Sequence, residues 1–429
     1  LNCPEPKQQP AAWFQPKNAA EALQEHFHLT QLTPLGLDDH KDAVCAAGAL
    51  MRYLTETQKN SLEHITALRY EQSGQTMLLD QNTRRNLELT ESLRGRGKKG
   101  TLLELLDKTA TAMGGRLLRS WIEQPLLSAE EIRKRHDAVE ELYGNSLLSA
   151  SLREELEGVY DMERLLSKVA YRNLNAHDCL SICASLKKIP GIKALLREAK
   201  CEALVEIHNG LDALEELSGL LERAIHPDAP VVITEGGIIR DGYSQELDEY
   251  REAQTNGKRW ILEMEQKERE STGIKNLRIQ YNRVFGYYIE VTKSFLNLVP
   301  ERYTRKQTLT NAERFMTPEL KETEQKIIGA QELSVRLELR LFNEIRDRVA
   351  AEIDRIQSNC SALKKLDVYQ SLARVALDNR YVRPEMTEDG ILKIKEGRHP
   401  VVERSLSDGG FVANDTLMDQ DENRMLIIT

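Results

Sequence analysis

Two long helical patterns with a β-rich segment between them constrain the fold of this chain most strongly. The first pattern begins at Ser244, which is a typical helix-capping residue, and extends to about Ser271. The second begins at Thr317 and Pro318, and no later proline interrupts it before about Gln357. At about 1.5 Å per residue, these roughly 40 residues form a rod about 60 Å long.

Apolar residues in the second pattern recur every three or four positions, which is the spacing of one helical face. They are Val335, Leu339, Phe342, Ile345, Val349, Ile353 and Ile356. The sequence therefore predicts a mainly α fold, in which long helical levers carry a small inserted β module and partial α/β pieces lie at both ends.

The segment between the two patterns has the composition of β-strands. "IKNLRIQYNRVFGYYIEVTK", residues 274–293, is rich in Tyr, Val and Ile and has a turn signal at 283–286. We therefore predict a β-hairpin there. "RYTRKQTLTNAERFM", residues 302–316, predicts a further strand and turn.

This β segment is also strongly basic. Between Lys275 and Lys306, seven basic residues are opposed by Glu290 and Glu301 alone, so 7 − 2 gives +5, whereas the whole chain has a net charge of −9 and the remainder −14. Such a separation of charge suits a polyanionic partner, and neutral side chains such as Asn282 and Asn311 can donate to phosphate oxygens. The alternative is a solvated basic surface without a partner. The predicted DNA-binding residues are Lys275, Arg278, Asn282, Arg283, Lys293, Arg302, Arg305, Lys306 and Asn311.

The flanking regions carry shorter patterns. Residues 18–61 and 101–222 have helical periodicity, and Glu235-Gly236-Gly237 between apolar runs predicts a hairpin. After about residue 381, "LKIKEGRHPVVE", "GFVAND" and "RMLIIT" predict short strands that begin an α/β domain. The last run is expected to be a strand buried on both faces of a parallel sheet, with the rest of that domain beyond residue 429.

Several functional classes lack support in the sequence. No apolar run reaches about 18 residues, so no membrane span is predicted. The six cysteines form no CxxC pair, and we expect free thiols in a reducing compartment. Gly95, Gly97 and Gly100 match GxGxxG, but a helical pattern precedes them where a dinucleotide site requires a strand. No catalytic residue and no metal ligand is predicted.

Eight motifs together resemble the MutS family of DNA mismatch-repair proteins, in the family's order and over nearly the whole chain. They are "RRNLELT", "GGRLLRSWIEQPL", "FGYYIEVTK", "QTLTNAERF", "PELKETE", "EGRHPVVE", "FVAND" and "RMLIIT". The resemblance implies that 1–65 is the C-terminal part of a connector domain, 66–257 and 317–379 a helical lever domain, 258–316 a DNA-binding clamp, and 380–429 the first strands of an ATPase domain.

The resemblance also implies functional residues and partners. Asn282 and Asn311 match clamp positions that lie against DNA. Phe411 matches an aromatic residue that stacks on adenine, flanked by Val412 and Asn414, although a core phenylalanine is the alternative on sequence alone. A parent protein would be a DNA-dependent ATPase that uses ATP and Mg²⁺, a homodimer with a MutL-type partner in the bacterial cytoplasm.

In the family, the strand that matches "RMLIIT" precedes a phosphate-binding loop, and a mismatch-reading domain precedes the connector. We therefore expect this segment to bind duplex DNA without reading its sequence and to lack ATPase activity. A different class of function remains open, namely a coiled-coil scaffold that binds protein partners. Salt-dependent DNA binding distinguishes the two, because a scaffold should show none.

Overall fold

The computed structural model is mainly α-helical, which confirms the predicted fold class, and it contains two small antiparallel sheets. It describes residues 8–27, 37, 40–58, 62, 65, 68, 75–93, 95, 97–170, 173–230, 232–282, 286–406 and 410–426. The chain divides into two compact units. The first comprises Leu1–Leu174, Ser181–Ser218 and Val349–Thr429, and the second comprises Asn175–Leu180 and Gly219–Arg348.

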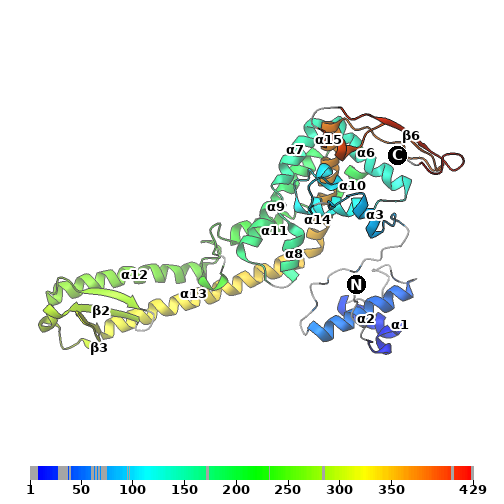
Figure 1. Cartoon of the computed structure of the whole chain (residues 1–429). Coiled ribbons are helices and arrows are strands. Elements are labelled where there is room, and N and C mark those ends of the chain that lie inside the picture. Colours follow the sequence, from blue (N-terminus) through cyan, green and yellow to red (C-terminus); the bar gives the residue numbers. More distant parts are fainter. Residues whose placement is uncertain are drawn as a thin grey trace. The chain divides into compact units, whose positions relative to one another are not determined.

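The first unit contains most of the helices (Figure 1). Its elements, including two that continue into the second unit, are η1 (Ala11–Phe14), α1 (Pro16–Phe27), α2 (Lys41–Gln58), α3 (Gln81–Asn86), α4 (Leu102–Leu106), α5 (Ala112–Glu123), α6 (Ala129–Gly144), α7 (Ser146–Glu157), α8 (Met162–Ala170), α9 (Ala176–Leu195), α10 (Glu202–Gly210), α11 (Glu215–Ala224), α14 (Ile353–Asn379) and α15 (Pro400–Ser405).

Helix α14 is central to the first unit, because it packs against α4, α5, α6, α7, α8 and α10. Leu363, Leu366 and Val368 on it are fully buried. Asp367 is also fully buried, and its carboxylate accepts hydrogen bonds of 2.8, 2.8 and 2.7 Å from the Ala110 N–H, the Thr111 N–H and the Thr111 hydroxyl. Burial raises the pKa of Asp367. These donors satisfy a polar group that would otherwise destabilise the core.

Helices α1 and α2 form a separate small core near the N-terminus. Ala19, Leu23, Val44 and Met51 are buried there. The helices approach closely, since a Cβ on Gly48 would lie 2.4 Å from the Cα of Ala19. The predicted helical pattern of 18–61 is thus confirmed over α1 and α2.

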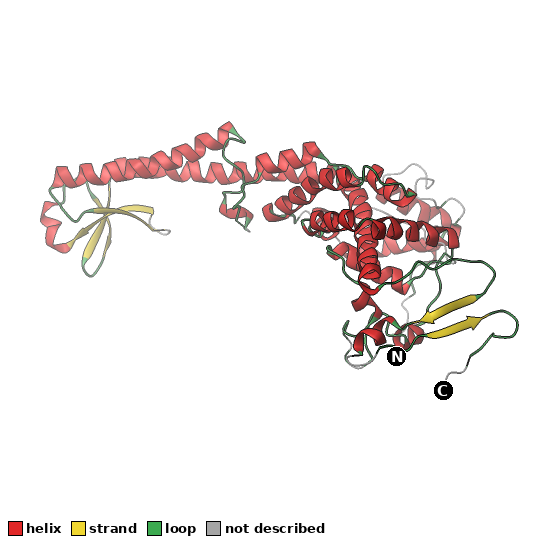
Figure 2. Cartoon of the chain, turned by 90° about the horizontal axis from the view of Figure 1, so that it is seen from above, coloured by secondary structure: helices red, strands yellow, loops and turns green. Residues whose placement is uncertain are grey.

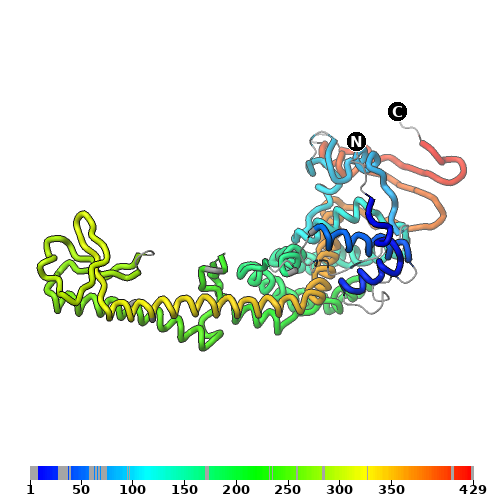
Figure 3. Tube along the Cα trace, turned by 90° about the horizontal axis from the view of Figure 1, so that it is seen from below, coloured from blue at the N-terminus to red at the C-terminus, as the bar shows by residue number. Residues whose placement is uncertain are grey.

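The second unit contains two long antiparallel helices and a four-stranded sheet at one end of them (Figure 3). Helix α12 (Gln245–Thr272) is capped by Ser244, whose hydroxyl accepts from the Leu247 N–H at 3.5 Å. Helix α13 (Pro318–Ala351) is capped by Thr317, whose hydroxyl accepts from the Leu320 N–H at 3.2 Å. Both helix starts were predicted from the sequence.

The second lever helix differs from the prediction in one respect. The sequence predicts one helix through Gln357, but α13 ends at Ala351 and α14 begins at Ile353. Glu352 between them has φ −103° and ψ 12°, outside the α-helical range. Two residues of the predicted apolar face illustrate its burial, since Phe342 is 0% exposed and Ile345 is 1% exposed.

The predicted hairpin at Glu235–Gly237 is wrong. Residues Ile233–Glu235 form a short 3₁₀ helix, η3, and Ile239 makes an isolated bridge with Ile225 instead of pairing with a preceding strand. A tertiary contact explains why the hairpin does not form. The backbone N–H groups of Ile238 and Ile239 donate to the Glu338 carboxylate on α13.

Near the C-terminus, β5 (Leu392–Gly397) and β6 (Asn414–Met418) form a two-stranded antiparallel ribbon (Figure 2). Strands were predicted here, but Pro400–Ser405 at the end of "LKIKEGRHPVVE" forms the helix α15, and Phe411 to Ala413 precede β6 and are not part of it. The predicted strand at the end of the chain is not formed at Met425 and Leu426, and residues 427–429 lie outside the described residues.

Candidate nucleic-acid interface

The four-stranded sheet of the second unit, called the clamp sheet below, consists of β1 (Arg278–Asn282), β2 (Gly286–Thr292), β3 (Thr304–Thr308) and β4 (Ala312–Met316). Its strand order is β1-β2-β4-β3, and all pairs are antiparallel. A short 3₁₀ helix, η4 (Lys293–Leu298), follows β2. The predicted hairpin of residues 274–293 is confirmed, although its turn residues 283–285 lie outside the described part.

One face of the clamp sheet packs on the two long helices. The buried residues of this core are Ile261, Ile274, Leu277, Ile279, Ile289, Val291, Tyr303, Phe315, Met316, Leu320 and Ile327. Side chains alternate between the two faces of a strand, so Arg278, Gln280 and Asn282 are directed away from the face of buried Ile279. The sheet therefore keeps a polar surface that the helices do not cover.

The strand register collects three predicted cations and one asparagine at one end of the clamp sheet. Arg278 begins β1 opposite Glu290, and Lys293 directly follows the end of β2. The Lys293 N–H donates to the Asn311 carbonyl at 3.1 Å, which brings the β3–β4 turn to the same end. The Asn276 amide donates to the Thr292 hydroxyl at 2.5 Å, which brings the segment before β1 there as well. We call Lys275, Arg278, Lys293 and Asn311 the basic end.

The three cations of the basic end are exposed and have no ion-pair partner among the described residues. Glu290 is the acid directly opposite Arg278, but the Arg314 Nε lies 3.3 Å from its carboxylate. Arg314 also donates to Gln307 at 2.8 Å and lies 4.2 Å over the ring centre of Tyr288. Positive charge at the basic end is therefore available to a partner.

Arg302 is held differently from the cations of the basic end. Its guanidinium donates to the Glu268 carboxylate of α12 at 2.6 Å, and the Tyr303 hydroxyl donates to the same oxygen at 2.7 Å. The Glu268 side chain is only 4% exposed, whereas that of Arg302 is 50% exposed. The nearby Glu268 charge raises the pKa of Arg302, and burial raises that of Tyr303. The sequence-based charge count missed this pairing because Glu268 precedes the counted segment.

Arg305 is also paired, at the β3 edge of the sheet. Its Nε lies 2.9 Å from Glu313 Oε2. That buried oxygen has no hydrogen-bond partner in the described structure, so the contact is an ion pair without a well-directed hydrogen bond. Lys306 follows at an irregularity of the β3–β4 register and is exposed. Arg305 and Lys306 therefore line the edge rather than the basic end.

Asn282, another predicted contact, lies apart from the basic end. Asn282 is half-buried at the far end of β1, four residues from Arg278, which is about 13 Å along a strand. Arg283 follows it and lies outside the described residues. The structure thus brings four of the nine predicted DNA-binding residues together and separates Asn282, Arg302, Arg305 and Lys306 from them.

Comparison with known proteins shows which family this architecture represents. The family model of MutS domain III matches residues 82–373, and that of MutS domain II matches residues 4–66. The chain belongs to the MutS family. The domain III match includes both long helices and the whole clamp sheet, so the predicted resemblance is confirmed.

Curated relatives have the same assignment. The DNA mismatch repair protein MutS of Lachnoclostridium phytofermentans is 48% identical over 97% of this chain and 45% of its own length. The proteins of the same name from Caldicellulosiruptor bescii and Symbiobacterium thermophilum are 51% and 49% identical, over 90% and 97% of this chain and 45% and 48% of their own lengths. The chain therefore spans about half the length of the MutS relatives it matches.

The three residues of this MutS chain that were predicted to bind a nucleotide lie just before β6 or at its start. Phe411 is half-buried, and Val412 is 78% exposed. Asn414 begins β6, and its side-chain amide donates to the Val412 carbonyl at 3.1 Å. The Phe411 ring is therefore partly accessible, and the Asn414 amide is engaged by the backbone of its own segment.

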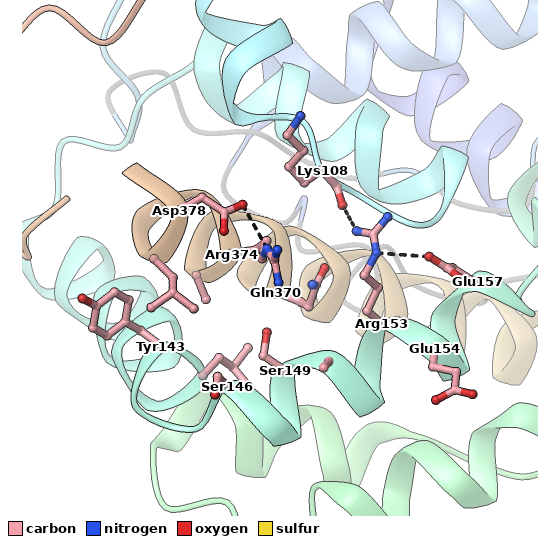
Figure 4. A pocket seen from close by; sticks show the side chains of 14 residues that line it. Lys108, Tyr143, Ser146, Ser149, Arg153, Glu154, Glu157, Gln370, Arg374 and Asp378 are labelled. Atoms are coloured by element: carbon pink, nitrogen blue, oxygen red, sulfur yellow. Dashed lines mark hydrogen bonds and ion pairs between the residues drawn. The ribbon is translucent and has the colours of Figure 1, made fainter. Parts of the chain in front are cut away.

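A cavity of about 470 Å³ opens among α6, α7 and α14 of the first unit (Figure 4). Its guanidinium groups are neutralised within its own wall. Arg153 donates to the Lys108 carbonyl and lies 3.1 Å from Glu157, while Arg374 donates to Asp378 at 2.9 Å. We therefore assign no DNA contact to this cavity.

Cysteine and metal chemistry receive no support from the described structure. The five cysteines there form no disulfide, and burial raises the pKa of Cys201 to about 11 and that of Cys360 to about 12, which disfavours reactive thiolates. Cys3 lies outside the described residues. Within those residues, no group of three or more His, Cys, Asp or Glu could hold a metal ion. None of the described helices combines the length and apolar character that crossing a membrane requires.

Proposed function

We propose that the clamp sheet binds the phosphate backbone of double-stranded DNA, without reading base sequence, as part of DNA mismatch repair. The observation that carries this proposal is the basic end. There the fold gathers Lys275, Arg278 and Lys293 from separate segments and leaves each of them without an ion-pair partner in the described structure.

The chemistry of the basic end suits phosphate better than base edges. Lysine ammonium groups are compact charges, and each phosphate that they neutralise releases condensed counterions from the duplex. The neighbouring Asn311 can donate a neutral hydrogen bond to a phosphate oxygen. Because backbone contacts carry no sequence information, we expect equal affinity for a matched duplex and for one with a single mismatch.

The decisive experiment is a titration of the chain with a fluorescent duplex between about 50 and 200 mM salt. Wild-type affinity should fall steeply with salt. The double variant Lys275→Gln with Lys293→Gln should bind more weakly, and the slope of log K against log salt should decrease in magnitude by about one to two.

The matched control changes two lysines of the β5–β6 ribbon to Gln. Lys393 and Lys395 of β5 are exposed, and their replacement by Gln removes the same net charge. This control should bind like wild type. No salt-dependent binding by wild type would refute the proposal and favour the scaffold function, whereas equal losses in both variants would indicate an effect of net charge alone.

The proposal extends to a protein that has the full length of the relatives. We propose that such a protein is a DNA-dependent ATPase with ATP and Mg²⁺ as cofactors, that it acts as a homodimer with a MutL-type partner, and that it works in the bacterial cytoplasm. Residues 258–316 would be its clamp, 66–257 and 317–379 its levers, 1–65 the end of its connector, and 380–429 the beginning of its ATPase domain.

The nucleotide part of the proposal rests on Phe411, with Val412 and Asn414 beside it. In the full-length protein, Phe411→Ala should weaken ATP binding by the loss of one stacking face, worth about 1 kcal/mol, and should leave DNA binding without nucleotide unchanged. An unchanged affinity for ATP would assign Phe411 to the protein core.

A further inference from the structure

A buried charged network joins α12 and α13 away from the clamp sheet. Glu338 of α13 has a side chain that is only 3% exposed, and its Oε1 accepts from Arg251 Nη2 of α12 at 2.9 Å. A buried carboxylate requires donors for its oxygens, because an unpaired charge is strongly disfavoured in the interior. Arg251 supplies one of these donors across the two helices.

The other oxygen of Glu338 holds the backbone segment 236–241. Its Oε2 accepts from the Ile238 N–H at 2.7 Å and more distantly from the Ile239 N–H at 3.4 Å. Arg251 contacts the same segment, since its Nη2 donates to the Ile239 carbonyl at 2.7 Å and its Nη1 donates to Asp241 at 2.5 Å. We call Arg251, Glu338 and residues 236–241 the bracket.

The bracket segment is also held on its opposite edge. The His226 N–H donates to the Ile238 carbonyl and the Arg240 N–H donates to the Ala224 carbonyl, each at 2.8 Å. Gly236 and Gly237 have φ of +78° and +76°, a conformation that other residues rarely adopt. One short segment thus connects the end of α11 to both lever helices.

The bracket lies at nearly equal distances from the clamp sheet along the two helices. Arg251 is 272 − 251 = 21 residues from the end of α12, and Glu338 is 338 − 318 = 20 residues from the start of α13. Each span is about 30 Å at 1.5 Å per residue. Since the clamp sheet joins the two far ends, any sliding of α12 along α13 moves that sheet.

We propose that the bracket is a positioning device for DNA binding, which fixes α12 against α13 and so holds the clamp sheet ready for the duplex. This inference rests on the proposed function of the clamp sheet. Without the bracket, only a fraction of molecules has a correctly placed clamp sheet, and the apparent dissociation constant rises by the inverse of that fraction. The clamp cations are unchanged, so the salt slope stays the same.

The test is Glu338→Gln in the whole chain. The new amide NH₂ group must face either the Arg251 guanidinium or the Ile238 N–H, which are both donors, so the bracket loses contacts without a change of shape. We expect duplex affinity to fall at least about fivefold at every salt concentration, with an unaltered slope. The matched control is Glu332→Gln, which removes the same charge from an exposed position of α13 and should bind like wild type.

A double-mutant cycle separates positioning from simple stabilisation. The cycle compares Arg251→Gln, Glu338→Gln and the variant that carries both changes. The losses in unfolding free energy should be non-additive, and so should the losses in duplex affinity, which are measured well below the melting temperature. A purely structural role predicts coupling in stability alone. If Glu338→Gln fails to fold, Arg251→Lys retains the charge without the forked geometry and should give a smaller affinity loss in the same direction.

The outcomes distinguish this inference from the proposed function. Wild-type binding that is salt-dependent, together with unchanged affinity in Glu338→Gln and Arg251→Lys, would overturn the positioning role and leave the clamp proposal intact. A reduced salt slope in Glu338→Gln would also overturn it, because that result requires lost phosphate contacts. Absence of DNA binding by wild type would refute the clamp proposal itself.

Discussion

The clamp sheet and the β5–β6 ribbon are both antiparallel, and both carry exposed lysines, yet they are built differently. The clamp sheet shares a core with two long helices, in which Ile289 and Val291 are fully buried. No residue of β5 or β6 is buried. On the clamp sheet, the register of two paired strands brings Lys293 beside Lys275 and Arg278, whereas Lys393 and Lys395 are neighbours on a single strand.

On the proposed function, the two elements differ in the support behind their exposed basic residues. A rigid support has to hold them in one place, because the entropy of ordering long side chains and a mobile backbone opposes binding. The clamp sheet has such a support in its core and in the two helices.

The largest expected difference concerns the core behind each β element. Phe315→Ala removes a ring that is 4% exposed in the clamp core and should lower the free energy of unfolding by about 3–5 kcal/mol. Ile394→Ala on β5, where the side chain is 41% exposed, should change it by about 0.5 kcal/mol or less. Urea denaturation followed by circular dichroism, with hydrogen exchange at clamp amides, measures both. Similar losses would show that the ribbon has a core of its own.

The next effect concerns the approach of the helices that support the clamp sheet. A Cβ on Gly257 of α12 would lie 2.4 Å from the Ile327 Cγ1 of α13, so Gly257→Ala should lower the free energy of unfolding by about 1–3 kcal/mol. Gly329 on α13 has open space around it, and Gly329→Ala should raise the free energy of unfolding by up to about 1 kcal/mol. Thermal unfolding of the two variants side by side tests this contrast, and equal stability would mean that the helices lie farther apart at Gly257.

A smaller effect is expected from the edge of the clamp sheet. Replacing Arg305 and Lys306 with Ala should weaken duplex binding, but the salt slope should change less than in the variant at Lys275 and Lys293. The reason is that Glu313 already neutralises Arg305 in the free protein. Duplex titrations at several salt concentrations provide the comparison. A larger change of slope at the edge would move the main DNA contact from the basic end to β3.

The smallest expected effect comes from neutral donors. Asn311→Ala at the basic end should reduce duplex affinity by about 1 kcal/mol or less, since one neutral hydrogen bond has a small net worth. Asn282→Ala should reduce duplex affinity by no more than Asn311→Ala, and Asn414→Ala at the start of β6 should have no effect. The measurement is the same titration at low salt. A loss at Asn414 equal to that at Asn311 would place DNA against the ribbon too.

Much of the fold follows from local patterns. Ser244 and Thr317 were identified as helix caps because capping depends on residues only three positions apart. The hairpin of β1 and β2 follows from strand composition next to a turn signal. By contrast, Gly236 and Gly237 suggested a hairpin that does not form, because Glu338 attracts the backbone donors that a second strand would have used. That partner is 100 residues away from Ile238.

The amino-acid sequence alone predicts that a basic β module is inserted between two long helices, and that its positive charge contrasts with an acidic remainder. These properties depend on composition and on spacing along the chain. Which of these cations lack an ion-pair partner within the described residues follows from the tertiary structure. Arg302 is paired with Glu268, which is 34 residues away, while strand register brings Lys275, Arg278 and Lys293 to one end. Local patterns predict the hairpin that joins these segments, but they do not encode its exact register or an ion pair with a helix outside it.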